Sequence, residues 1–421
     1  MKIVMKRAAR PFVRFADGVQ KRWFRAVAGR RYATTLRSEA GTPPAFTGRL
    51  IVDLSVISQD DAGTGIQRVV RAIATNLAHV KSSSRAEILF VAMRGRRHYR
   101  LEPTDTGYCL TDEQVHFLAG DLFFGLDFSL DALWQMRGEL ARMRRKGVRF
   151  WYAVHDFLPL TQPQWFSAPT VLRFSNWLAI IAGTADGFFC VSQPVARQIP
   201  EILRQQAGLV ECPPAVVIPM GWDLSGSCPS TGLPPGFEDV LERLSGAPIV
   251  LQVGTIEPRK GHVDSLAAME MLWRDGIQTR LVLVGSAGWK MDEFVRRLKH
   301  HPEFGRRLFW TDRISDEALA RLYFACTGMI FPSLAEGFGL PVVEALAHGK
   351  PVLARRLDVF EPLEKHGVTL FDVDIAPSAL AGEIVRWLNG PAQKSPVTTD
   401  RQTWAATAAF ILETLNEGRV T

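Results

Sequence analysis

Two glutamates that flank a glycine-containing loop are the residues of this sequence best suited to carry chemistry. Glu336 and Glu344 stand on either side of the run Gly-Phe-Gly-Leu-Pro. The glycines permit unusual backbone angles, and the proline suits the first turn of a helix. Free amides of Phe338, Gly339 and Leu340 at that helix N-terminus would form an anion site. Carboxylates beside an anion site fit a ligand that also carries hydroxyl groups, as a sugar–diphosphate–ribose does.

A basic pair supplies the second candidate site. Arg259 and Lys260 follow the apolar run 248–255, which contains Gly254 and predicts a buried parallel strand. A helix is expected after the pair, as far as Asp275. Arginine offers bidentate contacts to phosphate, and lysine offers a point charge. The pair therefore predicts a contact to a diphosphate, while a charged surface loop is the alternative.

A glycine loop and a histidine are the candidates in the first half of the chain. Gly63 and Gly65 lie between a predicted strand at 48–55 and a predicted helix from Ile66, an arrangement that can cradle phosphate. The third glycine of a dinucleotide fingerprint is absent, so a tight turn explains them nearly as well. His155, with Asp156 beside it, follows the predicted strand 149–154, and ligands bind at such strand ends in doubly wound sheets.

The elements that must position these residues alternate between strands and helices and predict two α/β domains. A Ser-, Gly- and Pro-rich stretch at 224–247 suits a linker between them. We expect a basic amphipathic segment at 1–46, an acceptor-binding Rossmann-like domain at 47–235 and a nucleotide-sugar-binding Rossmann-like domain at 247–395. The fold class is therefore α/β, with two Rossmann-like domains facing across a cleft.

On the residues around Glu336 and Glu344, the sequence resembles the retaining glycosyltransferases of GT-B architecture, family 4 type, known as group 1 glycosyltransferases. The run from Thr64 to Arg71 is similar to a segment of bacterial polysaccharide mannosyltransferases. The resemblance implies a helix at 400–421 that crosses back to the first domain.

The resemblance also implies roles for individual residues. The expected catalytic residues are Glu336, His155, Arg259 and Lys260. His155 is expected near the donor sugar. Glu336 holds sugar hydroxyls and Glu344 holds ribose hydroxyls. The residues expected to bind the donor are Gly63, Gly65, Gly254, Arg259, Lys260, Ile314, Glu336, Phe338, Gly339, Leu340 and Glu344, with Ile314 near the base.

The expected reaction is the transfer of a sugar, with retention, from a nucleotide sugar to a saccharide or lipid-linked acceptor in surface polysaccharide or lipopolysaccharide synthesis. Mannose from GDP-mannose is the first choice of donor, and a glucose-type sugar on UDP is the second. A nucleotide-sugar epimerase and a non-catalytic donor-binding scaffold stay open as alternatives, because both could use the same fold.

Composition bounds the partners. Of the 421 residues, 47% are hydrophobic, which suffices for two domains with cores. Residues 1–40 hold 11 lysines and arginines against Asp17 and Glu39, and the rest of the chain is nearly neutral. This pattern argues against a nucleic-acid-binding face. A basic segment with aromatic residues predicts contact with an anionic membrane surface, while a solvated arm or a segment docked on the protein are the alternatives.

Cysteines and acidic pairs bear on compartment and metal. The five cysteines show no C-x-x-C spacing, which fits a reducing cytoplasm. No apolar run is long enough to span a bilayer. We therefore expect a cytoplasmic protein, peripheral on the inner face of the membrane. Asp372-Val373-Asp374 matches a pattern of metal-dependent transferases, but one such motif cannot show a ligand set. We expect no cofactor and no metal, with the nucleotide sugar as substrate.

Overall fold

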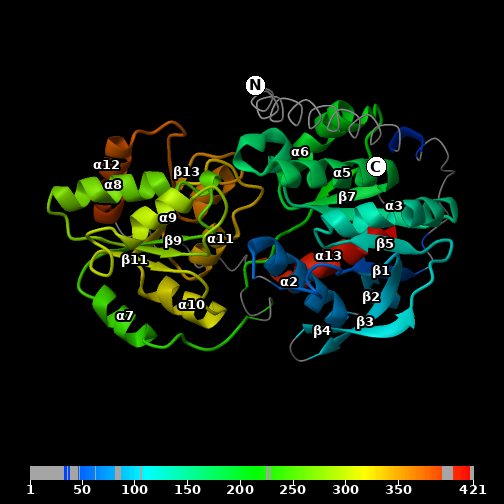
Figure 1. Cartoon of the computed structure of the whole chain (residues 1–421), viewed down its shortest axis with the longest axis horizontal. Coiled ribbons are helices and arrows are strands. Elements are labelled where there is room, and N and C mark those ends of the chain that lie inside the picture. Colours follow the sequence, from blue (N-terminus) through cyan, green and yellow to red (C-terminus); the bar gives the residue numbers. More distant parts are fainter. Residues whose placement is uncertain are drawn as a thin grey trace, which may run out of the picture.

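The computed structural model describes residues 33–35, 37, 46, 48–61, 63–80, 87–104, 107–223, 226, 229–390 and 402–417. Two α/β domains lie side by side and face each other (Figure 1). This is the fold class that the sequence predicted. Most of the predicted basic segment, residues 1–46, lies outside the described residues. Within it, Arg37 Nε donates to the carbonyl of Ala182 and its Nη2 to that of Ala185, both at 2.7 Å.

The first domain is built on a sheet of eight strands among the described residues, in the order β4-β3-β2-β1-β5-β6-β7-β8. Its strands are β1 (Arg49–Asp53), β2 (Glu87–Arg94), β3 (Arg97–Thr104), β4 (Gly107–Gln114), β5 (Leu122–Gly125), β6 (Arg149–Val154), β7 (Gly187–Cys190) and β8 (Ala215–Val217). The pairs β2–β3 and β3–β4 are antiparallel, and the other pairs are parallel. Its main helices are α2 (Gly65–Val80), α3 (Leu130–Arg145), α4 (Leu158–Thr161), α5 (Ala168–Thr184) and α6 (Gln193–Ile202).

The second domain has a wholly parallel sheet of six described strands, in the order β11-β10-β9-β12-β13-β14. They are β9 (Ile249–Val253), β10 (Arg280–Val284), β11 (Leu308–Thr311), β12 (Gly328–Phe331), β13 (Val352–Arg355) and β14 (Val368–Phe371). The helices are α7 (Phe237–Leu244), α8 (His262–Arg274), α9 (Asp292–Lys299), α10 (Asp316–Ala325), α11 (Leu340–Ala347) and α12 (Pro377–Asn389). The strand order reverses between β9 and β12, and ligands bind at such switch points in open α/β sheets.

The last described helix, α13 (Trp404–Glu417), leaves the second domain and lies against α2 of the first domain (Figure 1). Its first residue is buried, and the ring packs on Gly221, where any side chain would collide with it. Thr407 Oγ1 donates to the carbonyl of Pro219 at the end of the first domain. The C-terminal segment therefore belongs to the core of the first domain and crosses the boundary between the domains a second time.

Candidate active site

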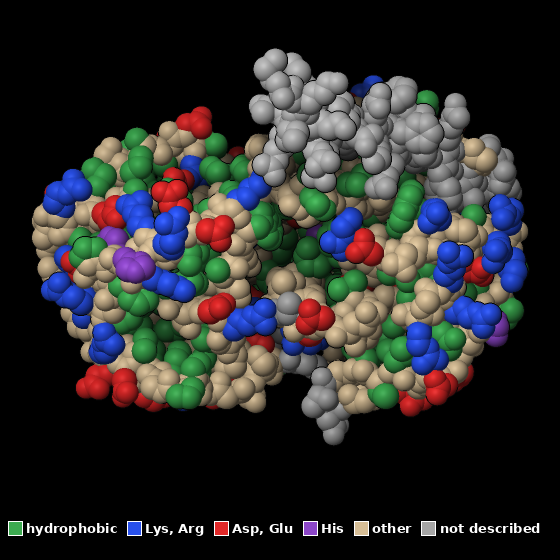
Figure 2. Space-filling view, in the orientation of Figure 1, with side chains coloured by type: hydrophobic (Ala, Val, Ile, Leu, Met, Phe, Trp, Pro, Cys, Tyr) green, Lys and Arg blue, Asp and Glu red, His purple; other side chains and the backbone are tan. Residues whose placement is uncertain are grey.

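A cleft of about 510 Å³ lies between the two domains, and both of them line it. Figure 2 shows a hollow at this boundary, with hydrophobic side chains inside it. Of the residues singled out from the sequence, nine line the cleft: Gly65, His155, Gly254, Arg259, Lys260, Glu336, Phe338, Gly339 and Leu340. They come from loops after β1, β6, β9 and β12, because the carboxyl ends of parallel strands meet at one edge of each sheet.

The basic pair is held in a single 3₁₀ turn, η4 (Pro258–Lys260), between β9 and α8. Gln252 Nε2 donates to the carbonyl of Lys260 at 3.0 Å, which ties the turn to its own strand. Gly261 ends the turn with a φ of +66°, and a Cβ there would lie 2.3 Å from the carbonyl oxygen of Pro332. Only glycine fits this close approach of the two loops at the switch point.

Glu336 lies directly against both cations. Lys260 Nζ is 2.6 Å from Oε1 of Glu336, and Arg259 Nη1 is 3.0 Å from Oε2. Burial raises the pKa of Glu336, but Lys260 and Arg259 lower it more, so that the net value is about 2. Glu336 is therefore ionised at any physiological pH. Arg259 also contacts Glu257 at 2.8 Å.

In these contacts the positive charges of Arg259 and Lys260 are nearly balanced by two carboxylates. Two cations face the carboxylates of Glu257 and Glu336 in a region where all four side chains are at least four-fifths buried. Burial and the neighbouring guanidinium of Arg259 lower the pKa of Lys260. A diphosphate that enters the cleft must therefore compete with carboxylates that already hold these cations.

The loop that contains Gly337 and Gly339, between β12 and α11, brings the two domains into direct contact. A Cβ on Gly337 would lie 1.9 Å from the carbonyl oxygen of His155, across the boundary between the domains. Ser192 Oγ donates to the carbonyl of Gly337 at 2.6 Å. Gly339 adopts a φ of +89° at the start of α11, where a Cβ would collide with the ring of Phe360. The N-terminus of α11 therefore faces the cleft, as an anion site requires.

His155 follows β6 and is 8% exposed. Its Nε2 is buried and has no hydrogen-bond partner among the described residues. Burial lowers the pKa of the imidazole to about 4, so the ring is neutral near pH 7. A buried, unpaired ring nitrogen at the cleft can bind a ligand group directly.

Three of the singled-out residues do not line the cleft. Gly63 lies one step outside it, where its amide donates to Asp61 Oδ1 at 3.0 Å. Ile314 packs partly buried against the core of the second domain. Glu344 is 2% exposed inside α11, and its carboxylate pairs with Arg68 of the first domain. The sequence could place Glu344 one turn into the helix, but it could not reveal a partner 276 residues away.

An apolar wall on the first domain was missed by the sequence reading. Its side chains come from α2, from the loops after β5, β7 and β8, from the start of α3, and from α5 and the turn before it: Ile66, Val69, Phe128, Leu130, Phe166, Phe174, Val191 and Met220. No local signal distinguishes such residues from ordinary core residues, because their types are the same.

A second contact closes the cleft from the loop after β10. Trp289 Nε1 donates to the carbonyl of Trp165, and Lys290 Nζ donates to that of Gln164, both at 2.6 Å. The rings of Phe166 and Trp289 lie 5.8 Å apart. Lys290 takes a left-handed φ of +59°, which is rare for a residue with a side chain. This loop therefore spans the cleft in addition to the contact at Gly337.

The described residues contain no group of three or more His, Cys, Asp or Glu side chains able to hold a metal ion. Asp372 and Asp374 are both exposed in the turn after β14. In the same part of the chain, no helix combines the length and the apolar character needed to cross a membrane.

Comparison with known proteins gives a consistent result. Residues 237–403 match the model of the family described as glycosyl transferases group 1. The serotype-specific mannosyltransferase WbdA of Escherichia coli is 36% identical over 381 residues, which cover 88% of this chain and 46% of that protein. The chain thus spans about half the length of the curated relatives that it matches most strongly.

Solved structures agree on the fold. The crystal structure of Anabaena HepE in complex with UDP and glucose superposes with a TM-score of 0.56 at 18% identity, covering 87% of this chain and 99% of that one. Sucrose-phosphate synthase from Thermosynechococcus elongatus gives 0.57 at 20% identity, covering 88% and 96%. At these identities the likeness concerns the arrangement of two domains around a cleft.

Proposed function

We propose that this chain, whose residues 237–403 match the group 1 glycosyltransferases, acts as a member of that family and transfers a mannose residue from GDP-mannose to a saccharide or lipid-linked acceptor in the synthesis of a surface polysaccharide. The similarity to WbdA, a mannosyltransferase by name, supports the choice of sugar. Donor, acceptor and stereochemistry are all part of this proposal.

One observation carries the proposal. Arg259, Lys260 and Glu336 meet the N-terminus of α11 at the switch point of a parallel sheet, in a cleft that a second domain closes. Cations and helix amides suit a diphosphate, and a carboxylate suits sugar hydroxyls. A nucleotide sugar offers these groups in that order.

The reaction breaks the bond between C1 of the sugar and the diphosphate, and it forms a bond between C1 and an acceptor oxygen. Arg259, Lys260 and the amides of Phe338 to Leu340 stabilise the charge that develops on the departing diphosphate. The proton of the acceptor hydroxyl passes to a departing phosphate oxygen on the same face of the sugar. The configuration at C1 is retained because attack and departure share that face.

The other site residues hold the substrate. Glu336, ionised and aimed at the cleft, accepts hydrogen bonds from sugar hydroxyls. His155 is neutral, and its Nε2, which has no hydrogen-bond partner in the described part of the chain, can accept a hydrogen bond from the donor sugar or donate one to it. Glu344 accepts hydrogen bonds from the ribose hydroxyls, which requires that Arg68 first release its carboxylate.

The acceptor enters from the side of the first domain. The apolar wall of the cleft fits the carbon face of a sugar or the lipid end of a linked acceptor. Residues 1–40, rich in lysine and arginine, would hold the cleft beside an anionic membrane on its cytoplasmic face.

Isothermal titration with GDP and with UDP, without metal, tests the donor site. We expect tighter binding of GDP and a loss of at least about tenfold in affinity in Glu344→Ala, since hydrogen bonds to a charged group contribute about 1.5–3 kcal/mol. Asp374→Asn, on an exposed turn, is the control and should bind as the wild type does. Preference for UDP would move the donor to a glucose-type sugar, and binding of neither nucleotide would overturn the proposal.

Product analysis tests the reaction. With GDP-mannose and a mannose-ended acceptor, the one-bond coupling between C1 and its proton in the product should show the α configuration of the donor. An inverted product would overturn the retaining route. Conversion of the donor sugar in the absence of acceptor would instead indicate an epimerase.

A further inference from the structure

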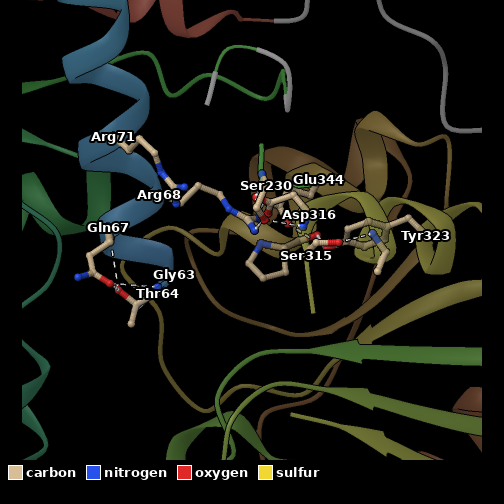
Figure 3. A network of polar contacts seen from close by, with 12 residues as sticks. Gly63, Thr64, Gln67, Arg68, Arg71, Ser230, Ser315, Asp316, Tyr323 and Glu344 are labelled. Carbon is tan, nitrogen blue, oxygen red and sulfur yellow. Dashed lines mark hydrogen bonds and ion pairs between the residues drawn. The ribbon is translucent and has the colours of Figure 1, made fainter. Parts of the chain in front are cut away.

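The carboxylate of Glu344 is already occupied in this structure. Its Oε1 accepts from Arg68 Nη1, and its Oε2 lies 3.0 Å from the hydroxyl of Tyr323 (Figure 3). The side chain is 3% exposed and does not line the cleft. Both oxygens that a ribose diol would use are therefore engaged before a nucleotide arrives.

The occupying cation comes from the opposite domain. Arg68 lies in the first turn of α2, directly after the loop of Thr64 and Gly65 that lines the cleft. Its guanidinium reaches across the boundary and contacts Glu344 and Asp316 of the second domain (Figure 3). The arginine side chain is 15% exposed, so water screens these contacts only weakly.

The two carboxylates differ in how well they are supported without Arg68. Asp316 Oδ2 also accepts from the amide and the hydroxyl of Ser230, at 2.8 and 2.9 Å. Asp316 further lies at the N-terminus of α10, where a negative charge is favourable. Among the described residues, the other side chain that donates to the carboxylate of Glu344 is Tyr323. The guanidinium can therefore stay with Asp316 while Glu344 exchanges it for other donors.

We infer that Arg68 is a positioning residue that competes with the ribose of the donor for Glu344. This inference rests on the proposed role of Glu344 as the ribose ligand. Only molecules in which Arg68 has released Glu344 bind the nucleoside, so the apparent affinity is reduced by the fraction in which the pair is intact. Arg259 and Lys260, the proposed ligands of the diphosphate, line the cleft and take no part in the contact between Arg68 and Glu344.

The test compares a ligand that has a ribose with one that lacks it. GDP and inorganic pyrophosphate are titrated into wild type, Arg68→Met and Arg68→Gln, two variants that remove the charge and keep part of the side chain. Arg71→Met is the matched control, one turn further along α2, where the guanidinium pairs with Asp61 at 3.5 Å. Thermal melting of each variant checks that it is folded.

We expect both Arg68 variants to bind GDP about fivefold or more tightly than the wild type, with pyrophosphate affinity and the Arg71 control unchanged. In a Glu344→Ala background, the Arg68 substitution should no longer tighten GDP binding, because the contested carboxylate is gone. Weaker or unchanged GDP binding would overturn the inference, as would equal tightening for both ligands. Failure of Glu344→Ala to weaken GDP binding to the wild type would count instead against the proposed ribose site.

Discussion

Lys260 Nζ lies 2.6 Å from Oε1 of Glu336, so the cation that would meet a donor diphosphate is already paired with the carboxylate that would meet the sugar. The two residues come from loops after β9 and β12, which are neighbours at the switch point of the second sheet. The contact means that substitutions of the two partners should have opposite effects on phosphate binding and the same effect on transfer.

Lys260→Met should weaken pyrophosphate and GDP binding and should lower kcat by about 10²–10³, because a positioned charge opposite the departing diphosphate is lost. Initial rates of GDP release from GDP-mannose with a saccharide acceptor measure the change. Lys299→Met, exposed on α9, is the control and should behave as the wild type. Transfer within about threefold of wild type in Lys260→Met would remove this lysine from the proposed mechanism.

Glu336→Gln should separate binding from reaction. Removing the carboxylate frees Arg259 and Lys260, so pyrophosphate should bind several-fold more tightly than to the wild type. Transfer should still fall by on the order of 10²-fold, because the ligand for the sugar hydroxyls is lost. Titration with pyrophosphate and single-turnover rates measure the two effects. If the variant bound pyrophosphate less tightly, Glu336 would instead be needed to hold Arg259 and Lys260 in position for the phosphate.

Gly337→Ala should disturb the contact between the domains. The added Cβ would lie 1.9 Å from the carbonyl oxygen of His155, so the loop or the whole domain must shift. A shift of about 1 Å in a reacting group can cost about 10²-fold in rate, and we expect a loss of that order in kcat/KM. Gly382→Ala in α12 is the control, because no atom lies within 4 Å of its Cβ position, and it should be neutral or slightly stabilising. Unchanged kcat/KM in Gly337→Ala would mean that the reacting form is more open than this structure.

The sequence predicted correctly that residues directly after parallel strands would lie at the cleft. Arg259, Lys260, Phe338 and Gly339 follow apolar strands, and parallel sheets bring such loops together. The hairpin of β3 and β4 was not predicted, because it lies at a sheet edge and its exposed, mostly polar residues give no alternating pattern. The partner of Glu344 depends on how two domains pack, and periodicity within one segment carries no information about that contact.

The neutral imidazole of His155 should make stability depend on pH. Burial lowers the pKa of His155 from 6.5 to about 4, so between these values the unfolded chain binds a proton that the native protein does not. The free energy of unfolding should therefore fall as the pH drops from about 6.5 to 4, by up to roughly 3 kcal/mol from this residue. Urea unfolding of wild type and His155→Gln at pH 7 and pH 4.5 measures the difference, and the variant should lose less stability.

The pH profile of kcat/KM should show no step near pH 6.5 that arises from His155. The reason is that the imidazole stays neutral down to about pH 4, since its pKa is lowered to about 4. His98 gives the control: burial lowers its pKa to about 4 as well, but it does not line the cleft. His98→Gln should therefore reduce the pH dependence of the free energy of unfolding and leave kcat/KM unchanged. His155→Gln should reduce the pH dependence of the free energy of unfolding and should also lower kcat/KM. If kcat/KM falls with an apparent pKa near 6.5 in the wild type and this step disappears in His155→Gln, the imidazole titrates in the reacting enzyme, and its assignment as a neutral ligand of the donor sugar is wrong.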